Sequence, residues 1–209
     1  MNYNSLVAEI QAYTENVFLT ADINTFITQA EQRIANAVQL PASFKYSTLS
    51  TSIGVATVTL PADYLATFSV ALQLPSGAQA YLINKDFTFL REAFPTTATG
   101  QPQYYALSQA YEITLAPIPS AVYPVSLAYY GYPDSITLPA GTSWLGDNFS
   151  SVLLYGSLVE AYTFMKGDQD VMTLYDTKFK EAMGLLKQLA DAKNRQDTFR
   201  SDQVRYPVK

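Results

Sequence analysis

The side chains of this chain that could do chemistry are its carboxylates and tyrosines, because the 209 residues include no histidine and no cysteine. Histidine is the most common general base and metal ligand, and cysteine is a reactive nucleophile and a soft metal ligand. Their absence excludes Ser-His and Cys-His nucleophile pairs, zinc sites built on cysteine or histidine, and haem ligation by either residue.

The carboxylates have no spacing that is typical of a catalytic or metal site. Asp168 and Asp170 lie close together, but at the start of an expected helix, where a carboxylate caps free backbone N–H groups. The sequence has neither a glycine-rich phosphate loop nor a G-x-S-x-G nucleophile elbow. We therefore expect no enzymatic activity, no cofactor and no metal. A glycosidase needs only two carboxylates and stays open as an alternative.

Five of the sixteen tyrosines lie in two short tyrosine-rich segments, Gln103–Tyr105 and Tyr129–Tyr132. Exposed tyrosine rings can stack on sugars or nucleobases. These segments contain no basic residue, so we do not expect nucleic acid to bind them. Two interpretations remain: alternate tyrosines fill a core and the others make a subunit contact, or the rings form a carbohydrate-binding platform.

The longer stretches of helical periodicity lie at the two ends of the chain. Leu6, Val7, Ile10 and Tyr13 predict a first helix. A second helix is expected to start near Thr20–Asp22, with a side-chain cap, and to stop before Pro41. After a loop from Pro133 to Gly146 that holds the single tryptophan, two more helices are predicted.

The third predicted helix starts at Asp147 or Asn148, runs to Met165 and is closed by Gly167 in a left-handed conformation. The fourth is capped by Asp168 and runs from Gln169 to Lys193. Its apolar residues step at heptad spacing, which predicts a seam against another helix. The seam residues are Met172, Tyr175, Phe179, Ala182, Leu186 and Leu189.

The middle of the chain has the alternating pattern and the breakers of β-structure. The expected strands are 45–53, 56–60, 66–74, 104–108, 111–116 and 124–130. One short helix is predicted from Asp86, which caps it, to Phe94, before Pro95. These elements predict a small β-sandwich or open barrel with a helix on it.

The fold class that follows is α+β: a helical bundle from both ends of the chain, a central antiparallel β-domain and an extended C-terminal arm. The expected divisions are 1–43 (helical pair), 44–133 (β-rich), 134–194 (loop and helical pair) and 195–209 (arm). The N-terminus lacks the pattern of a signal peptide, and no apolar stretch approaches the ~20 residues that span a bilayer. We expect no membrane partner.

Charge is distributed unevenly. Residues 1–150 hold four Lys/Arg and ten Asp/Glu, whereas 193–209 hold five Lys/Arg and two Asp/Glu. The acidic body would repel nucleic acid, and the basic tail can pair with an acidic partner. The tail contains Phe199, Val204 and Tyr206 among its arginines, which favours docking onto a partner over a merely solvated end.

Several segments, taken in order, resemble the adaptor, or head-to-tail connector, proteins of tailed bacteriophages. A Gly-x-Pro-x-Tyr-Tyr strand occurs at Gly100–Tyr105, and a Pro-x-Pro turn at Pro117–Pro119. A strand ending in Tyr-Tyr follows at Tyr129–Tyr130, and a Leu-Tyr-Gly-Ser-Leu-x-Glu-Ala helix at Leu154–Ala161. The resemblance extends over residues 55–185.

This resemblance implies a structural virion protein, made in the host cytoplasm, that forms a dodecameric ring at the neck between capsid and tail. The ring would bind the portal on one side and a tail, nozzle or head-closure protein on the other. Genomic double-stranded DNA would pass through its lumen without sequence-specific binding. The alternative is a carbohydrate- or receptor-binding module of a tail component, which predicts an exposed aromatic row on the β-domain.

By analogy with such connectors, the C-terminal segment 193–209 is expected to reach the portal. The residues expected to make this contact are Arg195, Phe199, Arg200, Arg205 and Tyr206. The loops near Pro75–Gly77 and Thr96–Gln101 are expected to contact the tail side or the neighbouring subunit.

Overall fold

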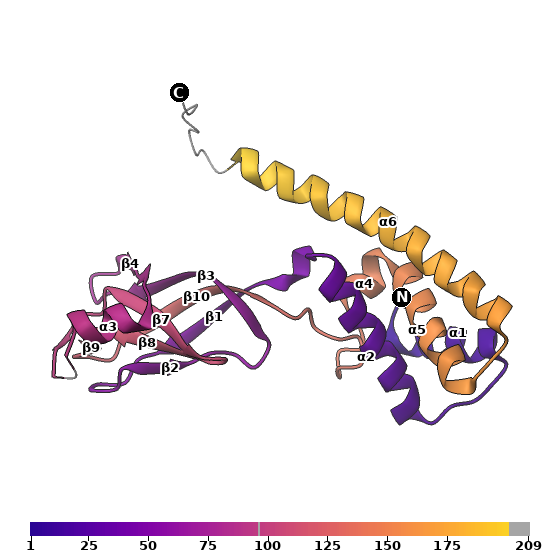
Figure 1. Ribbon diagram of the computed structural model, residues 1–209, viewed down its shortest axis with the longest axis horizontal. Coiled ribbons are helices and arrows are strands. Elements are labelled where there is room, and N and C mark those ends of the chain that lie inside the picture. Colours follow the sequence, from indigo (N-terminus) through magenta and orange to yellow (C-terminus); the bar gives the residue numbers. More distant parts are fainter. Residues whose placement is uncertain (96, 201–209) are drawn as a thin grey trace. The chain divides into compact units, whose positions relative to one another are not determined.

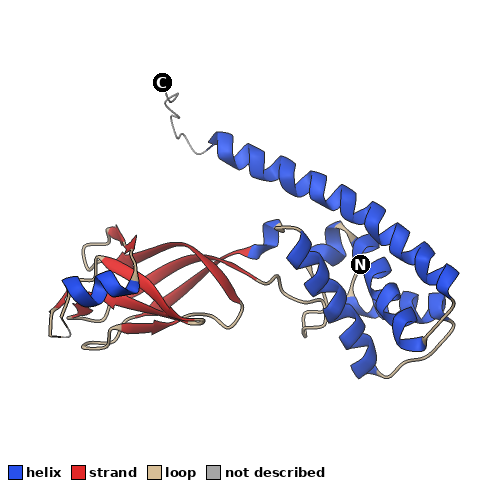
Figure 2. Ribbon diagram, viewed as in Figure 1, coloured by secondary structure: helices blue, strands red, loops and turns tan. Residues whose placement is uncertain are grey.

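The computed structural model describes residues 1–95 and 97–200, with side chains described as far as Asp191. It divides into two compact units, a helical unit of Met1–Ala42 with Pro133–Lys209 and a β-unit of Ser43–Tyr132. Figures 1 and 2 show that helices from both ends of the chain share one unit and that the strands lie in the other. The expected α+β class is confirmed.

The helical unit is organised around α5, which contacts α1, α2, α4 and α6. The helices are α1 (Tyr3–Thr14), α2 (Thr20–Ala37), α4 (Trp144–Asn148), α5 (Ser150–Met165) and α6 (Gln169–Arg200). A single 3-10 turn, Pro41–Ser43, follows α2. α5 is apolar on most of its circumference because it is surrounded by the other helices, and Val152, Leu153 and Leu158 are fully buried.

The starts and ends of these helices follow local capping in part. Asn2 and Ser5 form a capping box at α1, and the Asp170 N–H donates to Asp168 Oδ1 over 2.9 Å at the start of α6, as expected. The expected side-chain cap of α2 is wrong, because its N-cap is Leu19, which makes no such bond. Lys166 rather than Gly167 takes the left-handed conformation after α5, with φ of 52°.

The loop expected between Pro133 and Gly146 ends earlier than predicted, because α4 begins at Trp144. Ser143 caps α4 by accepting the Gly146 N–H over 3.1 Å. Phe149 then interrupts the helical path with ψ of 53°, so that α5 starts at Ser150 and not at Asp147 or Asn148. A five-residue helix is too short to leave a clear apolar period, which is why the sequence pattern missed it.

Helix α6 is longer than expected, and its buried residues do not keep the predicted heptad positions along its whole length. It continues to Arg200, so residues 195–200 are helical and the extended arm predicted from residue 195 is corrected there; residues 201–209 lie outside the described part. Phe179, Ala182 and Leu186 are buried as predicted, but Leu189 is 44% exposed and Ala190 is buried instead. A straight helix drifts about 20° per heptad, which moves a strict heptad position out of the contact.

The β-unit is a sandwich of two four-stranded sheets, in the orders β1-β10-β3-β4 and β2-β8-β7-β5, with a small β6-β9 pair. The longer strands are β1 (Phe44–Ser50), β3 (Tyr64–Gln73), β7 (Tyr104–Gln109), β8 (Glu112–Ala116) and β10 (Pro124–Gly131). The short ones are β2 (Thr57–Thr59), β4 (Gln79–Tyr81), β5 (Ile83–Asn84), β6 (Thr99–Gly100) and β9 (Ile118–Pro119). All six expected strands are present; β4, β5, β6 and β9 were not predicted.

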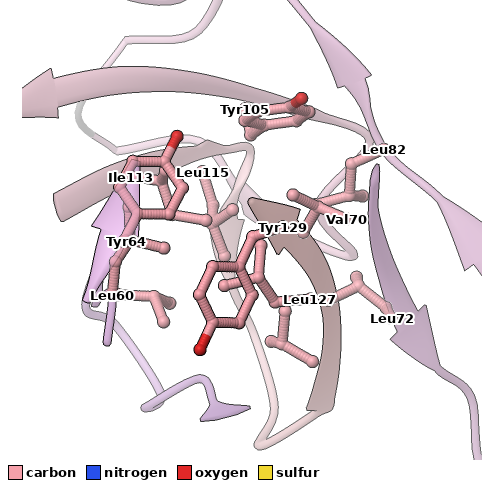
Figure 3. Close-up of a cluster of buried hydrophobic side chains, with 12 residues drawn as sticks. Leu60, Tyr64, Val70, Leu72, Leu82, Tyr105, Ile113, Leu115, Leu127 and Tyr129 are labelled. Atoms are coloured by element: carbon pink, nitrogen blue, oxygen red, sulfur yellow. The ribbon is translucent and has the colours of Figure 1, made fainter. Parts of the chain in front are cut away.

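The core of the sandwich is made by alternate residues of both sheets (Figure 3). In β10, Val125, Leu127 and Tyr129 point into it, which is the predicted period of two. The expected short helix is α3 (Phe87–Ala93), where the Thr88 N–H donates to Asp86 Oδ1 over 2.8 Å. Within the described ranges, no helix is long and apolar enough to cross a membrane.

Candidate functional site

The most prominent exposed feature of the β-unit is a cluster of four aromatic rings on the outer side of the β1-β10-β3-β4 sheet. We call Phe44, Tyr46, Phe68 and Tyr130 the aromatic face. Phe44 lies opposite Tyr130 in the β1–β10 register, and its ring centroid is 5.0 Å from Tyr46, 5.2 Å from Phe68 and 5.6 Å from Tyr130. Tyr46 is 77% and Phe68 62% exposed, so the cluster is open to contact.

Two irregularities in the β10–β3 pairing help to build this face. Ala128 pairs with Ser69 and Tyr129 with Thr67, which leaves Phe68 as an extra residue in β3. A second register shift skips Leu65, which is also exposed. A bulge re-aims a side chain at a cost in ladder hydrogen bonds. Each of the two bulges of β3 therefore brings an apolar side chain, Phe68 or Leu65, to the surface. Because these side chains are exposed, their burial within this chain does not offset the lost ladder hydrogen bonds.

The surroundings of the aromatic face are almost without charge. Residues 46–62, 64–84 and 113–133 contain no Asp, Glu, Lys or Arg, and these runs supply most of the β1-β10-β3-β4 sheet. The one charged residue of β1, Lys45, points to the core side and pairs with Asp63. Depletion of charge with enrichment of aromatic rings is the composition of the centre of a protein interface.

A second exposed apolar surface lies at the other end of the β1–β10 pair. Ile53, Val55 and Val122, which we call the apolar tip, are 65%, 45% and 60% exposed. Their two loops are tied together, since the Gly54 N–H donates to the Pro119 carbonyl over 3.0 Å and Thr51 Oγ1 donates to the Ala121 carbonyl over 3.1 Å. Gly54 has φ of 74°, a conformation that favours glycine. The two loops of the apolar tip are thus held together by hydrogen bonds.

One polar network fixes the end of the sandwich beside the aromatic face. Asp63 Oδ2 accepts from Lys45 Nζ over 2.7 Å, and Asp63 Oδ1 accepts from the Tyr129 hydroxyl over 3.1 Å. Burial acts to raise the pKa of Asp63, but the hydrogen bond and positive charge of Lys45, with the Tyr129 hydroxyl, lower it overall. The Asp63 carbonyl also accepts the Tyr132 N–H, so this residue holds the last strand in place.

A second partly buried carboxylate anchors the chain after the β-unit. Glu31 on α2 accepts the Ile136 N–H over 2.9 Å, and Ile136 is fully buried among the helices. Burial raises the pKa of Glu31, and hydrogen bonds from Ser135 and Ile136 partly offset this. The role of Glu31 is to position the segment that leads into α4.

The tyrosines divide between cores and surface. Tyr64, Tyr105 and Tyr129 are buried in the sandwich (Figure 3), whereas Tyr46 and Tyr132 are exposed. In the helical unit, Tyr13, Tyr155 and Tyr162 surround Tyr175, and burial together with the Tyr162 hydroxyl raises the pKa of Tyr175 to about 12. Tyrosines thus fill the cores, as the first interpretation expected, and an exposed aromatic cluster also exists. It centres on Phe44, Tyr46 and Phe68, which the tyrosine segments did not indicate.

The residues predicted for the portal contact lie at the end of the described part of the chain or beyond it. Arg195, Phe199 and Arg200 belong to the last turns of α6, beyond the described side chains, and Arg205 and Tyr206 lie outside the described residues. The predicted loop at Pro75–Gly77 is the β3–β4 turn, with Gly77 at φ of 83°. Within Thr96–Gln101, Thr99–Gly100 forms β6, and Thr96 is not described.

One concave site of the β-unit is an open, largely apolar cavity of about 340 Å³ between α3 and β8. Phe87, Leu90 and Phe94 line it from the helix, and Arg91 lies over the Phe87 ring at 4.7 Å. In the described ranges, no three Asp, Glu, His or Cys side chains are grouped to hold a metal ion. The surfaces that stand out chemically are therefore uncharged contact surfaces.

The fold and these surfaces define a two-unit α+β protein suited to contacts with other proteins. A family model described as SU10 adaptor protein matches residues 1–205, and the chain belongs to this family. The resemblance seen in the sequence is thereby confirmed, and the protein is a structural adaptor of bacteriophage virions. The comparison with curated proteins found no match.

Proposed function

We propose that this chain forms the ring that joins the portal to the tail, at the neck of the virion, around the exiting DNA. The observation that carries the proposal is the family match over residues 1–205. A ring of many copies, most simply a dodecamer, extends the DNA channel and presents a platform for a tail, nozzle or head-closure protein.

Charge and shape support this role. Residues 1–150 hold ten acidic and four basic residues, and an acidic channel wall lets DNA slide without specific binding. α6 has 32 residues, about 48 Å at 1.5 Å per residue, twice the length of α5. The length of α6 places the basic residues near its C-terminal end far from its first turn. We expect a partner to contact the helix at that end.

The portal contact is assigned to Arg195, Phe199 and Arg200 at the end of α6, together with Arg205 and Tyr206. Arginine and aromatic residues are the types that dominate interface energetics. The β-unit, including the β3–β4 turn and residues 96–101, is assigned to the tail-side partner or to the neighbouring subunit.

A triple substitution tests the portal assignment. The full chain with Arg195→Ala, Phe199→Ala and Arg200→Ala should keep its fold but lose binding to the portal ring of the same virus, measured by native mass spectrometry. The matched control is Lys178→Ala with Lys180→Ala, also on α6, whose lysines pair with Glu181 and Asp176. Undiminished portal binding by the triple variant would refute the assignment.

A second candidate is favoured by the exposed aromatic face, which a carbohydrate- or receptor-binding module predicts. The Phe44 ring, however, packs edge to face with Tyr46 and Phe68, at interplanar angles of 82° and 86°, and is tilted by 58° against Tyr130. A sugar platform needs ring faces that lie in one plane, and these rings stand at steep angles to one another. A glycan array with the intact protein tests this second candidate. Glycan binding that is lost in the Tyr46→Ala variant would show that the aromatic face binds carbohydrate and does not serve the connector.

A further inference from the structure

We propose that the aromatic face of one copy receives the apolar tip of the next copy, so that neighbouring β-units join head to tail. The proposal rests on the ring of the proposed function and names the surfaces that join its subunits. It concerns the β-unit alone, which has its own core and a defined internal register.

The two surfaces lie at opposite ends of one rigid ribbon. β1 and β10 pair without a break from Phe44 opposite Tyr130 to Ser50 opposite Pro124. The aromatic face lies at the first end and the apolar tip just beyond the second, about 20 Å away at 3.3 Å per residue. A ring needs heterologous contacts, in which two different patches of the same subunit meet. This ribbon carries two such patches in a fixed relation.

Size and charge favour a second copy of the chain as the occupant of the aromatic face. Tyr46 and Phe68 together leave roughly 300 Å² exposed, if each side chain presents roughly 200 Å². That is a substantial share of the roughly 800 Å² per partner in a stable interface. Neither surface contains a charged residue, and Thr51–Ala62 around the tip has none. A second copy therefore brings an apolar, uncharged surface to the aromatic face without burying an unpaired charge.

Engineered cysteines provide the direct test, because the natural chain has none. The full-length variant with Tyr46→Cys and Ile53→Cys, treated with a short bis-maleimide, should give a ladder of covalent multimers. Either substitution alone should give no multimers. The matched control combines Ile53→Cys with Tyr111→Cys, since Tyr111 is also an exposed tyrosine of the β-unit but belongs to neither surface; it should give no ladder.

A charge exchange tests the same contact energetically. Tyr46→Lys alone and Ile53→Asp alone should each weaken self-association by about 30-fold, the factor that corresponds to about 2 kcal/mol. The chain that carries both substitutions should recover most of this loss, because every head-to-tail contact then joins a lysine to an aspartate. Sedimentation velocity over a concentration series measures the change, with and without the portal ring.

The outcomes separate this proposal from the proposed function. Rings on the portal without a ladder, or a dimer from Tyr46→Cys alone, would overturn the head-to-tail contact and leave the connector role intact. A ladder and charge rescue without portal binding would support the contact and remove the connector role. The head-to-tail contact would also be overturned if the chain stays monomeric in every condition. The same holds if the protein binds a glycan and the Tyr46→Ala variant does not.

Discussion

At the scale of single residues, Asp63 connects three segments of the β-unit. Its carboxylate joins Lys45 of β1 to Tyr129 of β10, and its carbonyl accepts the Tyr132 N–H. Gly131 lies against the same residue, because a Cβ there would be 2.8 Å from the Asp63 carbonyl oxygen. Asp63 and Gly131 thus together allow the close approach of β10 to the loop before β3.

Replacing this aspartate should change the pH dependence of stability. The pKa of Asp63 is lowered on folding, so the folded state binds fewer protons than the unfolded state. Its stabilising contribution is therefore present above the ordinary value of 3.8 and is lost as the pH falls through the lower, folded pKa. Asp63→Asn should cost about 1 kcal/mol at pH 7, since the group is partly exposed.

Urea unfolding at pH 7 and at successively lower pH measures this effect. The difference between Asp63→Asn and the natural chain should shrink as the pH falls below 3.8. Glu181→Gln is the control, because its pair with Lys178 is exposed and should contribute nothing measurable. A pH-independent loss in Asp63→Asn would show that the carboxylate charge has no part in the stability.

At the scale of elements, close helix packing depends on a glycine in α5. A Cβ on Gly156 would lie 3.0 Å from the Phe179 ring of α6 and 3.1 Å from Ala30 Cβ of α2. Because Gly156 has no side chain, α2, α5 and α6 can pack closely against one another at this position. The same heptad argument that predicted Phe179 in the seam gave no indication that a glycine must face it.

A pair of glycine substitutions separates packing from helix propensity. Gly156→Val should destabilise the helical unit by about 2 kcal/mol, because the added atoms overlap both neighbours. Gly184→Ala on α6 has nothing within 4 Å of its Cβ and should raise stability by about 0.5–1 kcal/mol. Thermal unfolding followed by circular dichroism at 222 nm measures both. Equal effects of the two substitutions would contradict the packing argument.

At the scale of the whole molecule, each of the two units has buried clusters of its own, so each unit should respond separately to mutation of its core. Leu72 is fully buried in the sandwich and Leu153 is fully buried among the helices. Replacing either leucine by alanine should lower the free energy of unfolding of its own unit by about 3 kcal/mol. Because the clusters share no residue, the loss should stay within the mutated unit.

Amide hydrogen exchange tests this separation. Leu72→Ala should speed exchange within residues 43–132 and leave residues 1–42 and 133–190 protected as in the natural chain. Leu153→Ala should give the converse pattern and serves as the matched control. Uniformly faster exchange in either variant would show that the two units unfold as one cooperative block.

Much of the fold could be predicted, because periodicity and chain breakers are local. The helices at both ends, six strands, the helix capped by Asp86 and the cap at Asp168 all follow from neighbours within a few residues. Elements of two to five residues, such as α4 and β5, leave too short a pattern. The adaptor family was also accessible from ordered motifs, and the match to residues 1–205 confirms it.

The candidate site was decided by tertiary structure. Phe68 is exposed because β3 shifts register against β10, whose residues lie about sixty positions away, and no local pattern encodes that shift. Leu189 turned outward because a straight helix does not keep a strict seven-residue repeat against its neighbours. By itself, the sequence determined the element types, the α+β class, the charge-poor runs and the family. Only the pairing of distant strands decided which aromatic rings meet at the surface.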